Sequence, residues 1–397
     1  MKGKKLNVKE FFAINTSIVS MLVMVILVGM GEKMAERFLP IYLIALGGST
    51  ISVGFLNGLD NLLGALYSFP GGYLSDRIGY KKSLLVFTII AMIGYSIVIL
   101  IPTWQAVLIG AFFFISWTAI SLPAIMSLVS SVVPKNKRAM GVSLHSLVRR
   151  IPMALGPLFG GFLIALYGNI AGIRIAFVIA LVFAFISIIV EQLFVKETNK
   201  KRSSINLSQM LKNLKGDLKI LLVADILVRF AEQIPYAFVV IWVIRNNGFT
   251  ALQFGILTTI EMITAMIVYI PVAYFADRYS KKPFVVTTFG FFTIFPLILI
   301  FSRNFEMLII AFIIRGLKEF GEPTRKSLII DLAPENAKAG TFGAYYLIRD
   351  IVVSGAAFTS AFLWNVSPYV NFLTAFAFGV IGTLYFAIFG RTLAQTN

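Results

Sequence analysis

Long apolar stretches follow one another along almost the whole chain, and they constrain the fold more than any other feature. A helix needs about 20 mostly apolar residues to cross a bilayer. The sequence contains twelve such stretches, separated by shorter polar segments. We expect spans at residues 12–46, 50–75, 82–101, 104–132, 138–167, 173–195, 217–245, 250–276, 283–301, 305–332, 338–366 and 369–390. The pattern predicts an all-α integral membrane protein with twelve transmembrane helices.

The composition supports a membrane protein and disfavours several classes of enzyme. Hydrophobic residues make up 58% of the 397 residues and charged residues only 13%, whereas soluble domains have about 25% charged residues. The chain has no Cys and one His, which excludes disulfides and thiolate metal sites and disfavours a Ser-His-Asp site. No phosphate-binding sequence of the G-x-x-x-x-G-K-[ST] type is present. We therefore predict no metal, no cofactor and no enzymatic activity.

The basic residues indicate how the chain is oriented. The formal net charge is +17, which in a soluble protein would indicate nucleic acid binding. Here the basic residues lie between hydrophobic runs, so membrane lipids are the predicted partner and nucleic acid is not. The clusters are at residues 2–9, 77–82, 135–138, 196–219 and 278–282. Because Lys and Arg accumulate on the cytoplasmic side, both termini are predicted to be cytoplasmic in the inner (cytoplasmic) membrane.

The longest polar connection divides the chain into two halves. Residues 196–216 contain the sequence KETNKKRSS between the sixth and seventh expected spans. We predict an N-terminal six-helix bundle at 1–195, a cytoplasmic linker at 196–216 and a C-terminal six-helix bundle at 217–397.

The two halves resemble each other at an offset near 200. The segment PGGYLSDR at 70–77 matches PVAYFADR at 271–278. Further matches are Asp60 with Glu261, Pro123 with Pro323, Pro134 with Pro334, Asn136 with Asn336, Arg149 with Arg349 and, at a shifted offset, KMAE at 33–36 with RFAE at 229–232. Several matches in nearly one register indicate an internal repeat of six spans.

The loop after the second span contains a recognisable motif. Residues 72–82 are GYLSDRIGYKK, and they resemble the G-x-L-x-D-R-x-G-R-K signature of the major facilitator superfamily. Only Tyr80 departs from it, at a position where the family usually has a base. The predicted gating residues are Gly72, Asp76, Arg77, Gly79 and Lys81, with Asp277 and Arg278 as their counterparts in the second half. The alternative is a charged loop that only fixes the topology.

The resemblance implies a fold and a transport mechanism. Members have two pseudo-symmetric six-helix bundles that alternate in access around a small-molecule site near the membrane midplane. In this family spans one, four, seven and ten line the central cavity, and a monomer is the usual state. Mapped onto this sequence, the predicted cavity residues are Glu36, Glu232, Arg315, Glu319 and Glu322.

The fifth span carries a second motif. The sequence PMALGPLFGG at 152–161 resembles the G-x-x-x-G-P-x-x-G-G motif of exporters that exchange substrate for protons. The matching residues are Gly156, Pro157, Gly160 and Gly161. The alternative is ordinary close packing of small residues between helices. The fourth span has no charged residue, whereas many such exporters have an Arg there, and this counts against a standard drug–proton exchanger.

Ionisable residues inside the expected spans are candidates for proton coupling. Such residues usually face a cavity or a partner. Burial favours the neutral form of a carboxylate and a nearby Arg favours the charged form, so a conformational change can load or release a proton. The candidates are Asp60, Glu261, Glu32, Arg149 and Arg349. The alternative is that these residues form permanent ion pairs.

Together these features favour a secondary active transporter for a small organic solute. Proton-coupled efflux by antiport is the first hypothesis, and the span-five motif favours it. The alternative is a proton-coupled symporter, or a carrier of lysolipids or organic anions, which the many cations in the spans leave open. A membrane-embedded enzyme would need a cluster of His, Cys or metal ligands, and a polytopic receptor would not need the loop motif in both halves.

Overall fold

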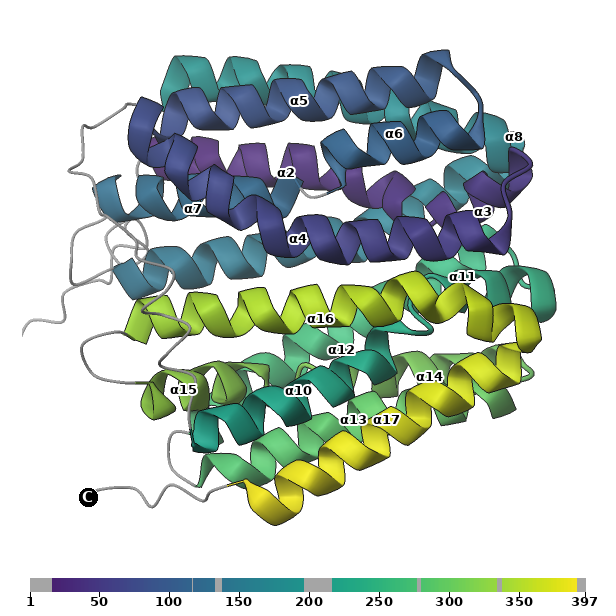
Figure 1. Cartoon of the computed structure of the whole chain (residues 1–397). Helices are drawn as coiled ribbons and strands as arrows, with labels where there is room; N and C mark the ends of the chain where they lie inside the picture. The colour runs from purple at the N-terminus through teal and green to yellow at the C-terminus, as the bar shows by residue number, and fades with distance from the viewer. Residues whose placement is uncertain are drawn as a thin grey trace, which may run out of the picture. The chain divides into compact units, whose positions relative to one another are not determined.

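A computed structural model of the chain describes residues 16–115, 117–132, 138–195, 216–276, 280–333 and 338–390. All regular secondary structure in these ranges is helical, and Figure 1 shows the helices side by side within each part of the chain. The first half of the chain contains α2 (Thr16–Glu36), α3 (Leu39–Ala45), α4 (Thr50–Ile78), α5 (Tyr80–Leu100), α6 (Trp104–Phe114), α7 (Trp117–Val132) and α8 (Arg138–Phe194). The second half contains α10 (Asp217–Gln233), α11 (Phe238–Ile241), the π-helix η2 (Trp242–Asn246), α12 (Ala251–Ala276), α13 (Lys281–Phe301), α14 (Phe305–Leu317), α15 (Glu322–Leu332), α16 (Lys338–Val366) and α17 (Pro368–Phe389).

The helices form two compact units. The first unit comprises Met1–Leu39 and Leu66–Ser203, and the second comprises Pro40–Ala65 and Ser204–Asn397. The helix α4 therefore contributes residues to both units.

Small residues allow close helix packing in the first unit, where α2 lies along α8 and α5 lies along α6. A Cβ atom at Gly31 of α2 would lie 2.7 Å from the Cα atom of Ala180 in α8. A Cβ atom at Gly94 of α5 would lie 2.6 Å from the carbonyl oxygen of Gly110 in α6. These contacts are possible only because the positions are glycine, which lets two helix backbones approach each other.

The core of the second unit lies between α10, α13 and α17. Leu221 and Val228 of α10 pack in one cluster with Phe289 of α13 and Phe386 of α17. Each of these side chains is at most 2% exposed. The core therefore holds α10, which carries several of the predicted functional residues, against its neighbours.

Four of the expected spans are interrupted. The first is divided into α2 and α3, the fourth into α6 and α7, the seventh into α10, α11 and η2, and the tenth into α14 and α15. These are the spans that the family resemblance places at the cavity. By contrast, the fifth and sixth expected spans lie in α8 and are separated only at Gly168, whose positive φ of 79° breaks the helical geometry.

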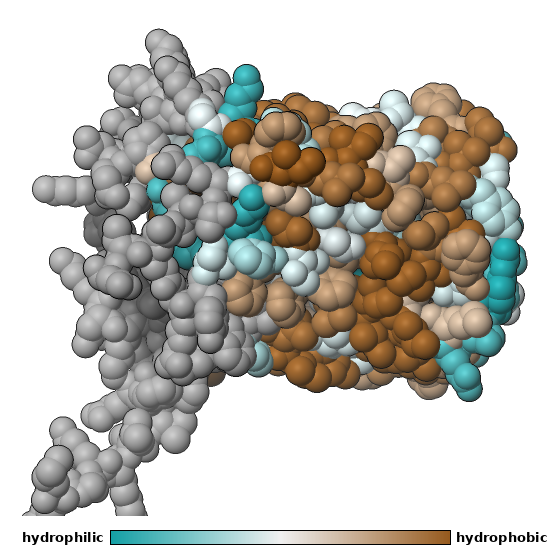
Figure 2. Space-filling view, turned by 90° about the horizontal axis from the view of Figure 1, so that it is seen from below, coloured by the Kyte–Doolittle hydropathy of each residue, from teal (hydrophilic) through white to brown (hydrophobic). Residues whose placement is uncertain are grey.

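Nine helical stretches among the described residues are long and apolar enough to cross a membrane. The number is lower than twelve because α8 contains two expected spans and the tenth span is divided into pieces of 13 and 11 residues. The helix α4 is not among the nine, and its apolar sequence is interrupted by Asn57, Asp60 and Asn61. Figure 2 shows hydrophobic residues over the middle of one face and hydrophilic residues near its ends. The multi-pass helical architecture is thus confirmed, and the number twelve stays a prediction.

Candidate functional site

Ion pairs in the second unit join five helices into one network. Each acid and base of the network lies within 4 Å of at least one partner of opposite charge. The members are Asp225, Arg229 and Glu232 of α10, Glu261 of α12, Arg315 and Lys318 at the end of α14, Glu322 and Arg325 of α15, and Arg349 and Asp350 of α16.

Asp225 is the most connected acid of this network. Its Oδ2 atom contacts a guanidinium nitrogen of Arg325, lies 3.4 Å from Nη1 of Arg349 and accepts a 3.0 Å hydrogen bond from the Tyr345 hydroxyl. The side chains of Asp225 and Arg325 are each 1% exposed. One carboxylate therefore ties α10 to α15 and α16, and its removal would leave buried cations without compensation.

Arg229 and Lys318 extend the network toward α14. Nη1 of Arg229 lies 2.6 Å from Glu232, and Nη2 lies 3.3 Å from Glu322. The other oxygen of Glu232 accepts a 2.8 Å hydrogen bond from Lys318. Glu232 and Glu322, two of the predicted cavity residues, thus share Arg229 as a partner.

Glu261 lies at the end of the network and its side chain is 0% exposed. Its Oε1 atom is 3.4 Å from Nε of Arg315 and 3.3 Å from Nζ of Lys318. The Arg315 guanidinium also packs 5.1 Å from the centre of the Phe295 ring. Two cations therefore lie within 3.4 Å of a carboxylate that is removed from water.

A polar cavity of about 250 Å³ lies beside the network within the second unit. Its amide groups are held in place by hydrogen bonds: Asn61 donates to the side-chain oxygen of Gln233 at 3.1 Å, and Asn57 donates to the Gln233 carbonyl at 2.8 Å. The lining residues are Asp60, Asn61, Gly64, Arg229, Gln233, Arg349, Asp350 and Val353. The structure thus brings the coupling candidates Asp60 and Arg349 to one cavity.

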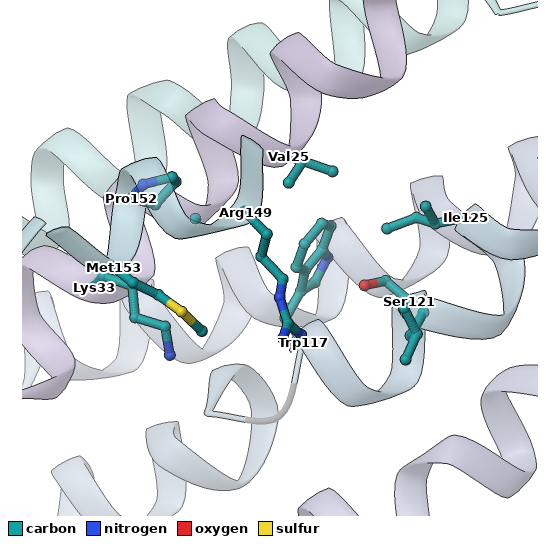
Figure 3. Close-up of a pocket in the computed structure, with 10 residues that line it drawn as sticks. Val25, Lys33, Trp117, Ser121, Ile125, Arg149, Pro152 and Met153 are labelled. Atoms are coloured by element: carbon teal, nitrogen blue, oxygen red, sulfur yellow. The ribbon is translucent and has the colours of Figure 1, made fainter. Parts of the chain in front are cut away.

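The first unit has a small pocket of about 20 Å³ between α2, α7 and α8. Figure 3 shows that Arg149 extends from its helix into this pocket, with Met153 on one side and Trp117 and Ser121 on the other. The lining residues are Val25, Gly29, Lys33, Trp117, Ser121, Leu122, Ile125, Arg149, Pro152 and Met153. The pocket therefore combines two cations with a mostly apolar wall.

Three charged residues at the end of α2 lie together next to this pocket. Nζ of Lys33 is 3.0 Å from Glu32 and also contacts the carboxylate of Glu36. Glu32 is 3% exposed. The predicted residues Glu32 and Glu36 are thus joined through one lysine.

Glu319, another predicted cavity residue, lies partly buried in the turn between α14 and α15 of the second unit.

The glycines of the fifth span lie against α2. A Cβ atom at Gly156 would lie 2.6 Å from the Cβ atom of Lys33, and one at Gly160 would lie 2.0 Å from the Met34 carbonyl oxygen. Pro157 and Gly161 are also buried. The segment therefore brings α8 into close contact with the part of α2 that carries the charged residues.

Only part of the loop motif falls in the described residues. Gly79 has a φ of 87°, a conformation that glycine adopts easily, and it separates α4 from α5. The exposed Arg77 lies 3.5 Å from the Tyr73 hydroxyl, and Lys81 donates a 2.8 Å hydrogen bond to the Gln192 carbonyl. The side chains of Gly72 and Asp76, and all of Asp277 and Arg278, lie outside the described residues.

Several residues of these sites are missing from the sequence-based site prediction. Asp225, Lys318 and Arg325 are charged residues within expected spans. Each lies three or four residues from another charged residue, namely Arg229, Arg315 and Glu322, respectively. This spacing places both side chains on one helix face and could have indicated these residues as members of the site. No sequence signal singled out Trp117 or Gln233. Among the described residues, no group of three or more His, Asp or Glu side chains could hold a metal ion.

Comparison with known proteins shows the same architecture. The sequence matches the Major Facilitator Superfamily over residues 21–224 and again over residues 221–392. An uncharacterized MFS-type transporter of Methanocaldococcus jannaschii is 22% identical over 374 residues, which cover 89% of this chain and 90% of the relative. The multidrug resistance protein MdtG of Proteus mirabilis is 24% identical over 350 residues, which cover 82% of this chain and 83% of the relative.

Solved structures resemble the chain over nearly its whole length. The nucleoside transporter NupG superimposes with a TM-score of 0.79 at 12% identity and covers 95% of this chain and 100% of its own. A bacterial homolog of the human lysosomal transporter Spinster, inward-facing and occupied, gives a TM-score of 0.74 at 14% identity, with 95% and 96% covered. At this identity the likeness concerns the fold alone. The sequence match, which spans most of the chain, shows that the protein belongs to the major facilitator superfamily of membrane transporters.

Proposed function

We propose that this transporter exports a small organic solute across the cytoplasmic membrane in exchange for protons. The observation that carries the proposal is Glu261, a fully buried carboxylate between Arg315 and Lys318. An ionisable group in this position is costly to bury and is typical of proton pathways in transporters. The similarity to a multidrug resistance protein and the glycine motif of the fifth span support the outward direction.

Glu261 would couple proton binding to helix movement through its two bases. Protonation removes the negative charge that Arg315 and Lys318 share, and Lys318 then keeps Glu232 as an ion-pair partner. The contact between α12 and α14 would weaken, and the helices could adopt the other state of the cycle. When Arg315 and Lys318 approach Glu261 again, their positive charges would favour release of its proton. Asp60 is the second candidate, because it shares a cavity with Arg229 and Arg349.

The proposed cycle is alternating access between an N-terminal half at 1–195 and a C-terminal half at 217–397. The proposed cytoplasmic location of the linker 196–216 and of both termini rests on the tendency of Lys and Arg clusters to stay on the cytoplasmic side. The loop around Asp76 and its counterpart around Asp277 would close the cytoplasmic side in each cycle. The proposed working unit is a monomer in the inner membrane.

A second candidate function is a proton-coupled symporter, or a carrier of lysolipids or organic anions. The many cations within the expected spans leave it open, and Arg149 extends into the mostly apolar pocket of the first unit. The direction of proton-driven flux separates the two. Export predicts that an inward proton gradient drives substrate outward, and symport predicts that the same gradient drives it inward.

Flux measurements on purified protein in proteoliposomes test the proposal. A compound panel is first screened with and without an imposed pH gradient. Glu261→Gln and Asp60→Asn are then compared with wild type and with Glu306→Gln, an exposed glutamate at the start of α14. The amide variants keep shape but cannot bind the proton. The variant at the coupling residue should lose accumulation against a gradient and keep substrate counterflow.

Two results would contradict the coupling role. If each variant loses folding yield and all transport modes together, the acids are structural ion-pair partners. If both variants keep full uphill transport, neither acid carries the proton, and Glu32, Glu36, Glu232 and Glu319 become the next candidates.

A further inference from the structure

The polar cavity of the second unit is large enough for a small solute. Its volume is about 250 Å³, whereas a single buried water needs about 10–15 Å³. Three helices each contribute one face to its wall, with Asp60, Asn61 and Gly64 from α4, Arg229 and Gln233 from α10, and Arg349, Asp350 and Val353 from α16. On each helix, two of these residues are four positions apart and so lie on the same face. The wall is therefore built from regular helix and has room for a molecule much larger than water.

The charged residues of the wall balance one another. Asp60 and Asp350 are the acids, and Arg229 and Arg349 are the bases. Nε of Arg349 donates a 2.6 Å hydrogen bond to Asp350. Nη1 of Arg229 donates one of the same length to Glu232. A solute with a net charge would have to displace such a pair or lose water without gaining a partner of opposite charge, and an unpaired charge removed from water is costly.

Two amide groups leave hydrogen-bonding atoms available in this cavity. The amide nitrogen of Asn61 donates to the Asn57 carbonyl at 2.9 Å and to Oε1 of Gln233 at 3.1 Å. These bonds fix the orientation of both side chains, because only the nitrogen of an amide donates and only its oxygen accepts. Oδ1 of Asn61 and Nε2 of Gln233 have no hydrogen-bond partner among the described residues, and both atoms are accessible. The wall thus offers one acceptor and one donor to a solute.

Gly64 gives access to the cavity by substitution. It lies three residues after Asn61 on α4, and nothing lies within 4 Å of the position that its Cβ atom would take. A larger residue at this position breaks none of the ion pairs or amide hydrogen bonds of the wall. The cavity can therefore be filled or charged while its other contacts stay intact.

We propose that this cavity binds a small solute without net charge that carries hydroxyl or amide groups. The solute would accept a hydrogen bond from Nε2 of Gln233 and donate one to Oδ1 of Asn61, and a hydroxyl or an amide can do both. This class differs from the lysolipids and organic anions of the second candidate function. The inference rests on the proposed transport of a small organic solute and names its class.

Two sets of probes that differ in charge test the class. The hexose set consists of glucose, its analogue with an amino group in place of the primary hydroxyl, and glucuronate. The nucleoside set consists of uridine and the corresponding amine and carboxylic acid. Binding to the purified full chain is measured at neutral pH by equilibrium dialysis of radiolabelled probes. In at least one set, the uncharged probe should bind at least about fivefold more tightly than both charged analogues, because a charged group would lose water without gaining a partner.

Filling the cavity should prevent binding. Gly64→Leu should weaken binding of the uncharged probe at least about tenfold, because the added side chain would occupy space that the solute needs. Gly290→Leu in α13 is the matched control, since nothing lies within 4 Å of its added Cβ atom either and Gly290 does not line the cavity. Thermal unfolding shows whether each variant is folded.

A charge added to the wall should change the preference. Gly64→Asp and Gly64→Asn have the same shape and differ by one charge. The carboxylate would give the wall a net negative charge and a partner for an ammonium group. Relative to Gly64→Asn, the Gly64→Asp variant should therefore shift the preference from the uncharged probe toward the amine at least about tenfold.

The proposal is overturned if neither uncharged probe binds more tightly than its charged analogues, if Gly64→Leu binds as tightly as Gly290→Leu, or if Gly64→Asp and Gly64→Asn have the same preference. Proton-driven flux is measured separately in proteoliposomes with charged and uncharged compounds. Proton-driven flux of charged compounds alone contradicts the class and supports the coupling, whereas binding of an uncharged probe without proton-driven flux contradicts the coupling and supports the class.

Discussion

The carboxylate of Asp225 in α10 contacts the guanidinium of Arg325 in α15, and both side chains are 1% exposed. Tyr345 and Arg349 contact the same carboxylate oxygen of Asp225. Buried pairs of this kind hold helices in one arrangement. Removing one partner of such a pair destabilises a protein more than replacing both partners by apolar residues.

Asp225→Asn should therefore destabilise the protein strongly. The amide cannot balance Arg325 and Arg349, and an uncompensated buried charge costs about 3–5 kcal/mol. Asp331→Asn is the matched control, because Asp331 pairs with Lys281 at 2.5 Å but its side chain is 40% exposed. Such a pair contributes at most about 1 kcal/mol. Thermal unfolding in detergent should show a much larger loss for Asp225→Asn, and equal losses would contradict the structural role of the network.

Gly160→Ala should disturb the packing of α8 on α2. The added Cβ atom would lie 2.0 Å from the Met34 carbonyl oxygen, so the helices must separate. Overpacking of this kind costs about 1–3 kcal/mol. Gly290→Ala in α13 is the control, since no atom lies within 4 Å of its added Cβ. In the same unfolding assay, Gly160→Ala should have a clearly lower thermal stability than Gly290→Ala. The reversed order would show that α2 and α8 do not pack this closely.

Asp76→Asn should impair transport more than expression. If Asp76 forms charge-assisted contacts that close the cytoplasmic side, losing its charge removes about 1–3 kcal/mol from the closed state. The balance of conformations then shifts toward the inward-open state. Substrate counterflow, normalised to the amount of purified protein, measures the effect. Normal cycling of the variant would exclude a latch at this loop.

Accessibility labels placed after Lys5 and near Lys200 should both be reached from the cytoplasm. The expectation follows from the basic clusters at the N-terminus and between the sixth and seventh spans. Labelling of intact cells with a membrane-impermeant reagent, before and after lysis, gives the side of each site. Labels on opposite sides would refute an arrangement of two parallel six-span halves.

The helices were predictable because long apolar stretches of sequence predict membrane spans. The family was predictable because the residues of the loop at 72–82 follow the spacing of a specific motif. The interruptions were not predictable from the local sequence. Pro235 lies in the break of the seventh span, yet Pro152 and Pro157 lie inside α8 without dividing it there. Whether a proline breaks a membrane helix depends on neighbouring groups that satisfy the freed backbone, and these are set by the tertiary structure.

The candidate site was predictable only as a set of residue types. The repeat pointed to Glu232 and Glu261, and the family resemblance, which places the tenth span at the cavity, pointed to Arg315 and Glu322. Pairing is a property of the fold: Lys318 contacts both Glu232 and Glu261 because α10, α12 and α14 meet at this point. The roles assigned to these residues in gating, coupling and substrate binding stay predictions.

The ion pair between Glu232 and Lys318 joins two interruptions of the helices. Glu232 is the last residue but one of α10, and Lys318 follows the end of α14. A helix loses its bending stiffness where its backbone hydrogen bonds are interrupted. Each of these spans therefore consists of helical segments separated by a break, and the 2.8 Å contact connects the break after α10 with the break after α14. While this contact and the ion pairs of α10 with α15 hold, the bend of one span is linked to the bend of the other.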